Sequence, residues 1–112
     1  MLTFSIGFGW VAGIGPRAGL QVPPQTVTTV KAAIRQAARH LGGAWVCTTD
    51  GHGVDELGEP EPCSIVVVTI PEEHAARFRE FLVGLAGYAE QRCFGVLATE
   101  TEFIGTREAV AS

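Results

Sequence analysis

The sequence predicts a single domain of the α+β class, in which a strand, a helix, two strands, a second helix and a last strand follow one another. Three observations predict this order. Apolar residues alternate along the first ten positions, they recur at steps of three and four in two later segments that each begin at a proline, and they form a nearly continuous β-branched run between those segments. The 112 residues have the length of one domain, and none of their stretches is a linker long enough to separate two.

The first strand is predicted from the alternation at the N-terminus. Side chains alternate between the two faces of a strand, so residues two apart share a face. One face is apolar and belongs to the core, with Leu2, Phe4, Ile6, Phe8 and Trp10. The other face is nearly bare, because it carries only Thr3, Ser5, Gly7 and Gly9.

The first helix is expected to begin at Pro23 or Pro24, because proline fits the first turn of a helix, where its missing N–H is not needed. Gly42 and Gly43 are typical of the end of a helix. Between these limits, apolar residues recur on one side of the helix at Val27, Val30, Ile34, Ala37 or Ala38, and Leu41.

Two strands are expected to follow. Residues 44–49 (AWVCTT) predict the first of them, and the turn-forming residues DGHG at 50–53 predict either a hairpin turn or the start of a longer, polar excursion. Residues 63–70 (CSIVVVTI) are nearly all β-branched or apolar, which predicts a central strand with apolar neighbours on both faces.

The second helix is expected to open at Pro71 with Glu72 and Glu73, since two carboxylates favour the positive end of a helix dipole. Its buried side is predicted to consist of Ala75, Phe78, Leu82, Leu85 and Ala89. A last strand is expected over about residues 93–103, followed by a polar tail, residues 105–112, that frays.

This order of elements, over about residues 2–104, resembles the ferredoxin-like βαββαβ fold. The resemblance implies a four-stranded antiparallel sheet with two helices on one face. The chain also looks like the small uncharacterised proteins carried on bacterial mobile (integron) gene cassettes, a likeness of the whole chain that no motif marks. Neither resemblance assigns a chemistry, because one fold serves many functions.

Composition and charge exclude some classes of binding partner. The net charge is −4, and the eight lysines and arginines are scattered, so a nucleic-acid partner is not expected. No apolar run approaches the length of a membrane span, which predicts a soluble, cytoplasmic protein without a membrane partner. The three cysteines are an odd number at wide spacing, which fits reduced, mostly buried thiols rather than disulfides.

The stretch GFGWVAGIGPRAG at residues 7–19 has the text of a dinucleotide-binding fingerprint, since Gly7, Gly9 and Ala12 fit G-x-G-x-x-A after a strand. In such a site the glycines lead straight into a helix whose N–H groups meet the pyrophosphate. Here prolines delay the helix to about residue 23. We therefore expect no nucleotide or other cofactor, and interpret the glycines as a bare strand face that another group approaches and a loop with unusual backbone angles.

Metal and catalytic sites are not predicted. Histidines and cysteines fall in no C-x-x-C or H-x-x-x-H arrangement, although a hairpin that joined Cys47, His52 and Cys63 is the most plausible route to a metal site. The acidic residues around His52 are interpreted as a solvated loop, and no activated nucleophile accompanies them. No catalytic residue is assigned.

This fold implies a sheet with one face not covered by helices, and the apolar residues on that face predict a protein partner. Ile65 and Val67 point to one face of the central strand, and Val66, Val68 and Ile70 to the other, so the helices can cover only one set. A two-fold pairing of sheet on sheet is a common way to cover the second, which predicts a homodimer through the open face.

Two functions fit these expectations. The first is a small dimeric ligand-binding or protein-interaction domain without catalysis, with a pocket for a small molecule between the glycine-rich connection and the sheet. Its ligand-binding candidates are Trp10, Arg17, Trp45 and His52, since tryptophans beside glycine-rich backbone form good pocket walls. The alternative is a small enzyme of the dimeric ferredoxin-like type, which uses a histidine and an acid for proton transfer.

Overall fold

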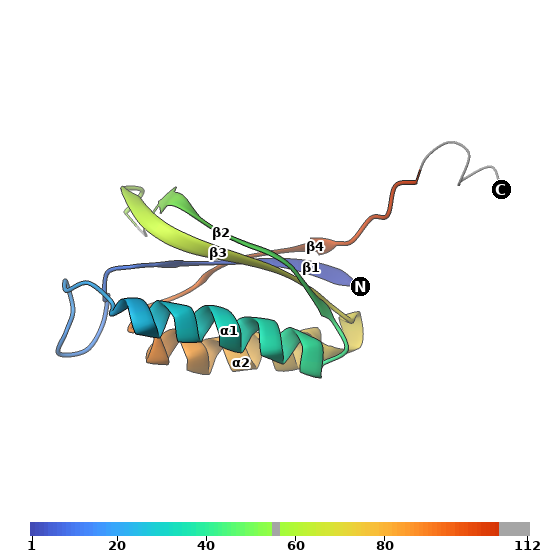
Figure 1. Cartoon of the computed structure of the whole chain (residues 1–112), viewed down its shortest axis with the longest axis horizontal. Coiled ribbons are helices and arrows are strands. Elements are labelled where there is room, and N and C mark those ends of the chain that lie inside the picture. The colour runs from blue at the N-terminus through green and yellow to red at the C-terminus, as the bar shows by residue number, and fades with distance from the viewer. Residues whose placement is uncertain (55–56, 106–112) are drawn as a thin grey trace.

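A computed structural model describes residues 1–54 and 57–105 (Figure 1). The elements are β1 (Leu2–Gly9), α1 (Pro24–His40), β2 (Ala44–Val54), β3 (Pro60–Ile70), a 3-10 turn η1 (Glu72–His74), α2 (Ala75–Tyr88) and β4 (Gly95–Glu100). The strands form one four-stranded sheet in the order β2-β3-β1-β4, and every neighbouring pair is antiparallel. The predicted α+β class and element order are confirmed, and both helices lie on the same face of the sheet (Figure 1).

The core lies between this covered face and the helices. β1 and β3 are the central strands, and their register pairs Phe4 with Val68 and Ile6 with Val66, all four fully buried. Phe78 of α2 meets Phe4 edge-on with 5.1 Å between the ring centroids. The predicted helix faces are correct, since the buried residues include Val30, Ile34 and Ala38 of α1 and Ala75, Phe78 and Leu82 of α2.

The β2–β3 hairpin is longer than predicted. DGHG is not a turn but part of β2, and its Asp50 and Gly51 pair with Ser64 and Cys63 of β3. The cross-strand ladder and the hydrogen bonds of the Asp50 side chain outweigh the turn propensity of these residues. β3 consequently begins at Pro60, three residues before the predicted start, and the supposed polar excursion is largely strand.

β4 is shorter than the predicted strand at both ends. The physical reason at its C-terminal end is the lack of a neighbour, because Glu100 already pairs with Leu2, the first residue of β1. One further bond, from the Thr101 N–H to the Met1 carbonyl at 3.1 Å, ends the ladder. Of the tail predicted to fray, all residues after Gly105 lie outside the described part of the chain.

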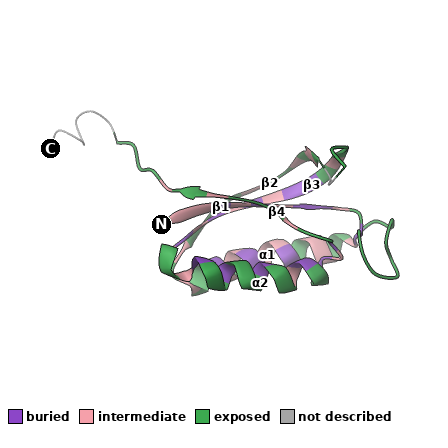
Figure 2. Ribbon diagram, turned by 180° about the vertical axis from the view of Figure 1, so that it is seen from behind, coloured by how far each residue is buried: buried purple, intermediate pink, exposed green. Residues whose placement is uncertain are grey.

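The other sheet face is open. It carries Thr3, Ser5 and Gly7 of β1, the half-buried Ile65 and Val67 of β3, and the exposed Leu97 of β4. The end of β2 and the start of β3 rise on this side at one end of the sheet, and residues 101–105 after β4 rise on it at the other end (Figures 1 and 2). No helix in the described ranges has the length and apolar character that a membrane crossing requires.

Candidate functional site

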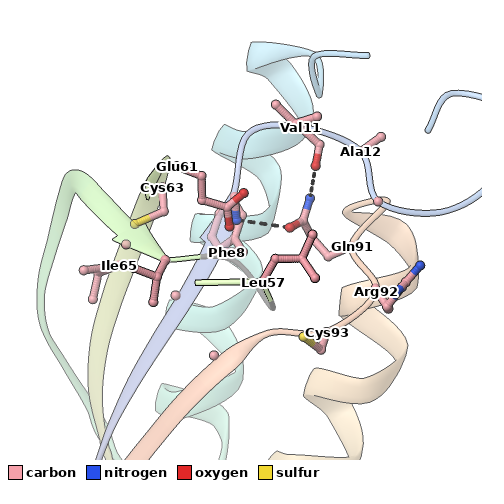
Figure 3. A pocket seen from close by; sticks show the side chains of 16 residues that line it. Phe8, Val11, Ala12, Leu57, Glu61, Cys63, Ile65, Gln91, Arg92 and Cys93 are labelled. Atoms are coloured by element: carbon pink, nitrogen blue, oxygen red, sulfur yellow. Dashed lines mark hydrogen bonds between the residues drawn. The ribbon is translucent and has the colours of Figure 1, made fainter. Parts of the chain in front are cut away.

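A hollow of about 680 Å³ lies on the open face, at the C-terminal end of β1 (Figure 3). Its walls come from β1 and the connection that follows it, from the β2–β3 hairpin, and from the segment that joins α2 to β4. We call this feature the hollow; it is lined by Gly7, Phe8, Gly9, Val11, Ala12, Gly13, Gly53, Val54, Leu57, Glu61, Cys63, Ile65, Gln91, Arg92, Cys93 and Gly95.

Glycines explain why the sheet is hollowed here. Gly7 pairs with Gly95 on one side and with Ile65 on the other, so two strands present bare backbone to the same spot. A Cβ atom on Gly7 would lie 3.8 Å from the Gly95 carbonyl oxygen and 3.9 Å from Ile65 Cγ1, which are ordinary contacts. The floor therefore has unoccupied space in which a bound group can approach the backbone.

Gly9 has a different role. A Cβ atom there would lie only 2.8 Å from both carboxylate oxygens of Glu61, which reaches across from β3 (Figure 3). The bare strand face expected from the sequence is thus approached by an acidic side chain of the same chain. Replacing Gly9 would displace this carboxylate into the hollow or out of it.

Gln91 fixes the wall of the hollow that the segment between α2 and β4 forms. Its side chain is 8 % exposed, and its Oε1 accepts a hydrogen bond from the Gly9 N–H at 3.1 Å. Its Nε2 donates to the Val11 carbonyl at 3.1 Å (Figure 3) and to the Ala89 carbonyl at 3.2 Å. One buried amide therefore joins the end of β1, the following connection and the end of α2, which makes the wall rigid.

The electrostatics of the hollow do not favour a reactive thiol. Burial, with a further contribution from the nearby Glu61 carboxylate, raises the pKa of the Cys63 thiol above its ordinary value of 9.0. Because the thiolate is the nucleophile, Cys63 stays protonated and unreactive at neutral pH.

The glycine-rich connection, residues 10–22, folds onto itself rather than opening a phosphate site. The N–H of Ala12 donates to the Leu20 carbonyl, that of Gly19 to Ala12, and that of Val22 to Trp10, all within 2.8 Å. The expected unusual backbone angles are confirmed at Gly15 and Gly19, with φ of 79° and 87°. α1 begins only at Pro24, so no helix N-terminus follows the glycines directly.

Trp10 takes part in a polar network on the covered face. Its Nε1 donates to Ser64 Oγ at 2.9 Å, and Ser64 Oγ donates to Asp50 Oδ1 at 2.8 Å. Lys31 Nζ donates to the same Asp50 oxygen at 2.9 Å. The bond from Lys31, and then the bond from Ser64, lower the pKa of the Asp50 carboxyl below 3.8. The network fixes α1 to β2 and β3.

Of the other three ligand-binding candidates, Arg17 and Trp45 lie away from Trp10, whereas His52 pairs with Pro62 of β3, whose carbonyl accepts a hydrogen bond from the Trp10 N–H at 3.3 Å. Arg17 pairs with Glu90 at 3.1 Å, which fastens the glycine-rich connection to the end of α2. Trp45 is 46 % exposed at the β2 edge, with the Arg35 guanidinium 5.4 Å from its ring centroid. His52 is exposed in β2. None of the four candidates is among the described residues that line the hollow.

The cysteine and histidine trio is not brought together either. Cys47 pairs with Val67, whereas Cys63 pairs with Gly51, four positions further along β2. His52 is adjacent to Gly51 and so points to the opposite face. In the described ranges, no group of three or more histidines, cysteines and acids is placed to hold a metal ion.

The residues that shape the hollow were missed at the sequence level. Glu61, Gln91 and Cys93 meet only through the tertiary fold, and no local pattern links them. The sequence did contain one signal, the spacing of the glycines. Gly7 and Gly9 share one face of β1, and Gly95 begins β4, which pairs with β1. Had the strand order been known, these glycines would have located the floor.

Comparison with known proteins adds no relative: the sequence matches neither a model of a known protein family nor a curated protein. The likeness to gene-cassette proteins therefore gains no support from them.

Proposed function

We infer that the domain has the ferredoxin-like arrangement. The support is the combination of element order, a sheet in which β1 lies between β3 and β4 and β2 is the outer neighbour of β3, and two helices on one face (Figure 1). This arrangement leaves one sheet face free, and the hollow lies on that face.

We propose that the protein is a small-molecule-binding domain without catalysis, and that the hollow is its binding site. The hollow carries this proposal, because its volume lies within the range of about 300–1,000 Å³ typical of ligand sites. Val11, Leu57 and Ile65 suit an apolar body, and Glu61 and Arg92 offer polar contacts at the margin. The preferred ligand is a compact apolar molecule with one polar end.

The enzymatic alternative finds less support. General acid–base catalysis by a histidine and an acid requires both side chains at the reacting atoms. None of the three histidines lies among the described residues that line the hollow, and the Cys63 thiol is held protonated. A binding role needs only the shape and the apolar lining of the hollow.

We propose that the protein forms a homodimer through the open face. Leu97 is 65 % exposed there, and Ile65 and Val67 lie on the same face, across β1 from it. A second copy would cover these side chains, each worth about 1.5–3 kcal/mol when fully buried. The odd number and wide spacing of the three cysteines fit a reducing, cytoplasmic location, which we retain as part of the proposal.

Native mass spectrometry tests binding and assembly together, because it reports subunit number and retained small molecules in one spectrum. Gly7→Val fills the floor of the hollow, and Gly51→Val is its control: it adds the same side chain to the same face where no described atom lies within 4 Å. We expect a dimer with a retained or added ligand in the wild type and in Gly51→Val, and loss of the ligand in Gly7→Val. Equal binding by all three proteins would place the ligand elsewhere.

The dimer interface is tested by Leu97→Asp, which sets a charge on the open face. Val83→Asp is the matched control, because Val83 is 75 % exposed on α2, which packs against the covered face. We expect Leu97→Asp to be monomeric and Val83→Asp to remain dimeric in sedimentation equilibrium. Two dimeric variants would move the interface away from the open face.

A further inference from the structure

The segment after β4 exposes two large apolar side chains. Phe103 is 85 % exposed and Ile104 is 89 % exposed, in an extended stretch that leaves the body of the domain (Figures 1 and 2). We call residues 101–105 the arm. Its base is fixed, since the Thr101 N–H donates to the Met1 carbonyl and the hydroxyls of Thr101 and Thr3 lie 2.6 Å apart. An anchored arm with an apolar pair at its end is suited to contact another surface.

The hollow, at the opposite end of the open face, lacks a wall. Ligand sites commonly enclose about 70–90 % of a bound molecule. The hollow has a glycine floor and side walls from the hairpin and from residues 91–95, but both α1 and α2 lie on the other face of the sheet and so cannot cover it (Figure 1). A complete binding site at this place therefore needs an apolar cover.

The arm does not reach the hollow of its own chain. β4 ends opposite Leu2, whereas the hollow begins at Gly7, roughly 17 Å further along β1. From Thr101 to Ile104 the arm spans at most about 14 Å, and it runs away from the hollow rather than toward it (Figure 1).

A second copy meets this geometry. The arm rises on one side of the sheet, and the end of β2 and the start of β3 rise on the same side at the opposite end (Figures 1 and 2). A two-fold axis that lies between two facing sheets and runs across the strands sets the arm of each copy over the hollow of the other. Thr3, Ser5 and Gly7 line the path between arm and hollow on β1, and their small size allows the two sheets to approach closely.

We propose that the arms are exchanged in the dimer, so that Phe103 and Ile104 of the partner subunit cover the hollow and complete the ligand site. This inference rests on the proposed dimer and on the proposed binding role of the hollow, and it names the partner: a second copy of this chain. Binding and assembly are then coupled, because a ligand that fills the hollow also contacts both subunits. Monomers would bind the ligand weakly.

The first test measures the dimer dissociation constant of the full chain by sedimentation equilibrium. Phe103→Ser with Ile104→Ser removes the apolar pair, and the control replaces Val83 and Tyr88, exposed on α2, by serine. We expect the arm variant to dimerise roughly 100-fold more weakly and the control to match the wild type, since buried aromatic anchors dominate such interfaces. An arm variant that dimerises like the wild type overturns the exchange and leaves the open-face dimer standing; a wild type that stays monomeric overturns both.

The second test locates the arm. Ile104→Cys in a Cys47→Ser background is treated with a short bismaleimide, which links thiols without oxidation, and the linked peptides are identified by mass spectrometry. We expect a link between subunits from position 104 to Cys93, which lines the hollow and is exposed, and none to the buried Cys63. The same chain with Cys93→Ser should lose that link. Links only between the two introduced thiols, or none in a protein that sediments as a dimer, would overturn the proposal.

Discussion

The two faces of the sheet are built from the same strands but differ in what their side chains do. On the covered face, Phe4, Ile6 and Val66 are fully buried against the helices. On the open face, the residues next to them in sequence are Ser5, Gly7 and Val67, which are small or half-buried. The covered face supplies most of the core, and the open face leaves space beside its few apolar side chains.

Glycines in a strand weaken it, because they have much conformational freedom to lose and no side chain to pack. Gly7, Gly9, Gly53 and Gly95 all line the hollow. Glu61 closely covers Gly9, and Cys63 Sγ lies 3.3 Å from a Cβ atom added to Gly53, whereas one added to Gly7 or Gly95 meets no atom closer than 3.8 Å. The fold thus tolerates glycines, which destabilise a strand, at one end of the open face. Their exposed backbone forms the floor of the hollow there. Stability and the proposed function are divided between the two faces.

The largest effect is expected from the covered face. Phe4→Ala removes a fully buried ring and its contact with Phe78, so the free energy of unfolding should fall by about 4 kcal/mol in urea denaturation. Leu97→Ala on the open face should change it by less than about 0.5 kcal/mol at concentrations where the protein is monomeric. Similar losses for the two variants would contradict the division between the faces.

A medium effect is expected from the buried serine of the polar network. Ser64→Ala leaves Trp10 Nε1 without its acceptor and removes one donor to Asp50, which should lower the free energy of unfolding by about 2 kcal/mol. Ser5→Ala is the control, because Ser5 is a half-buried serine on the open face of the neighbouring strand. The trial is thermal or urea unfolding of the two variants, and a control that loses as much as Ser64→Ala would remove any special role for the network.

The difference between the faces also explains what could be predicted from the sequence. The class, the element order and the buried helix positions depend on local periodicity, so Val30, Ile34 and Phe78 were predicted correctly. The hairpin was not, because the pairing of Asp50 with Ser64 depends on two strands meeting and on Lys31 from a third element. The hollow depends on three separate connections, and Gln91 joins two of them, the one after β1 and the one after α2. A residue pattern within one segment does not predict contacts between segments that are distant in the sequence.

The smallest effect should come from the pH dependence of the same network. The bonds from Lys31 and Ser64 lower the pKa of Asp50 in the folded protein below 3.8, its ordinary value. A depressed folded pKa means that the contribution to stability is fully present above pH 3.8 and is lost as the pH falls through the lower, folded value. Because the carboxylate is half-exposed and solvent screens the pair, the contribution should be about 0.5 kcal/mol or less.

Asp50→Asn keeps the shape of the side chain and removes its charge, so the stability difference from the wild type isolates this term. The wild type should be slightly more stable at neutral pH, and the difference should shrink as the pH falls below 3.8. Urea denaturation at a series of pH values measures it, with Lys31→Met as a second variant that removes the other charge of the pair. Because the network lies on the covered face, neither variant should alter dimerisation or ligand retention. A difference that grows in acid, or a loss of the dimer in Asp50→Asn, would show that the two faces are not independent.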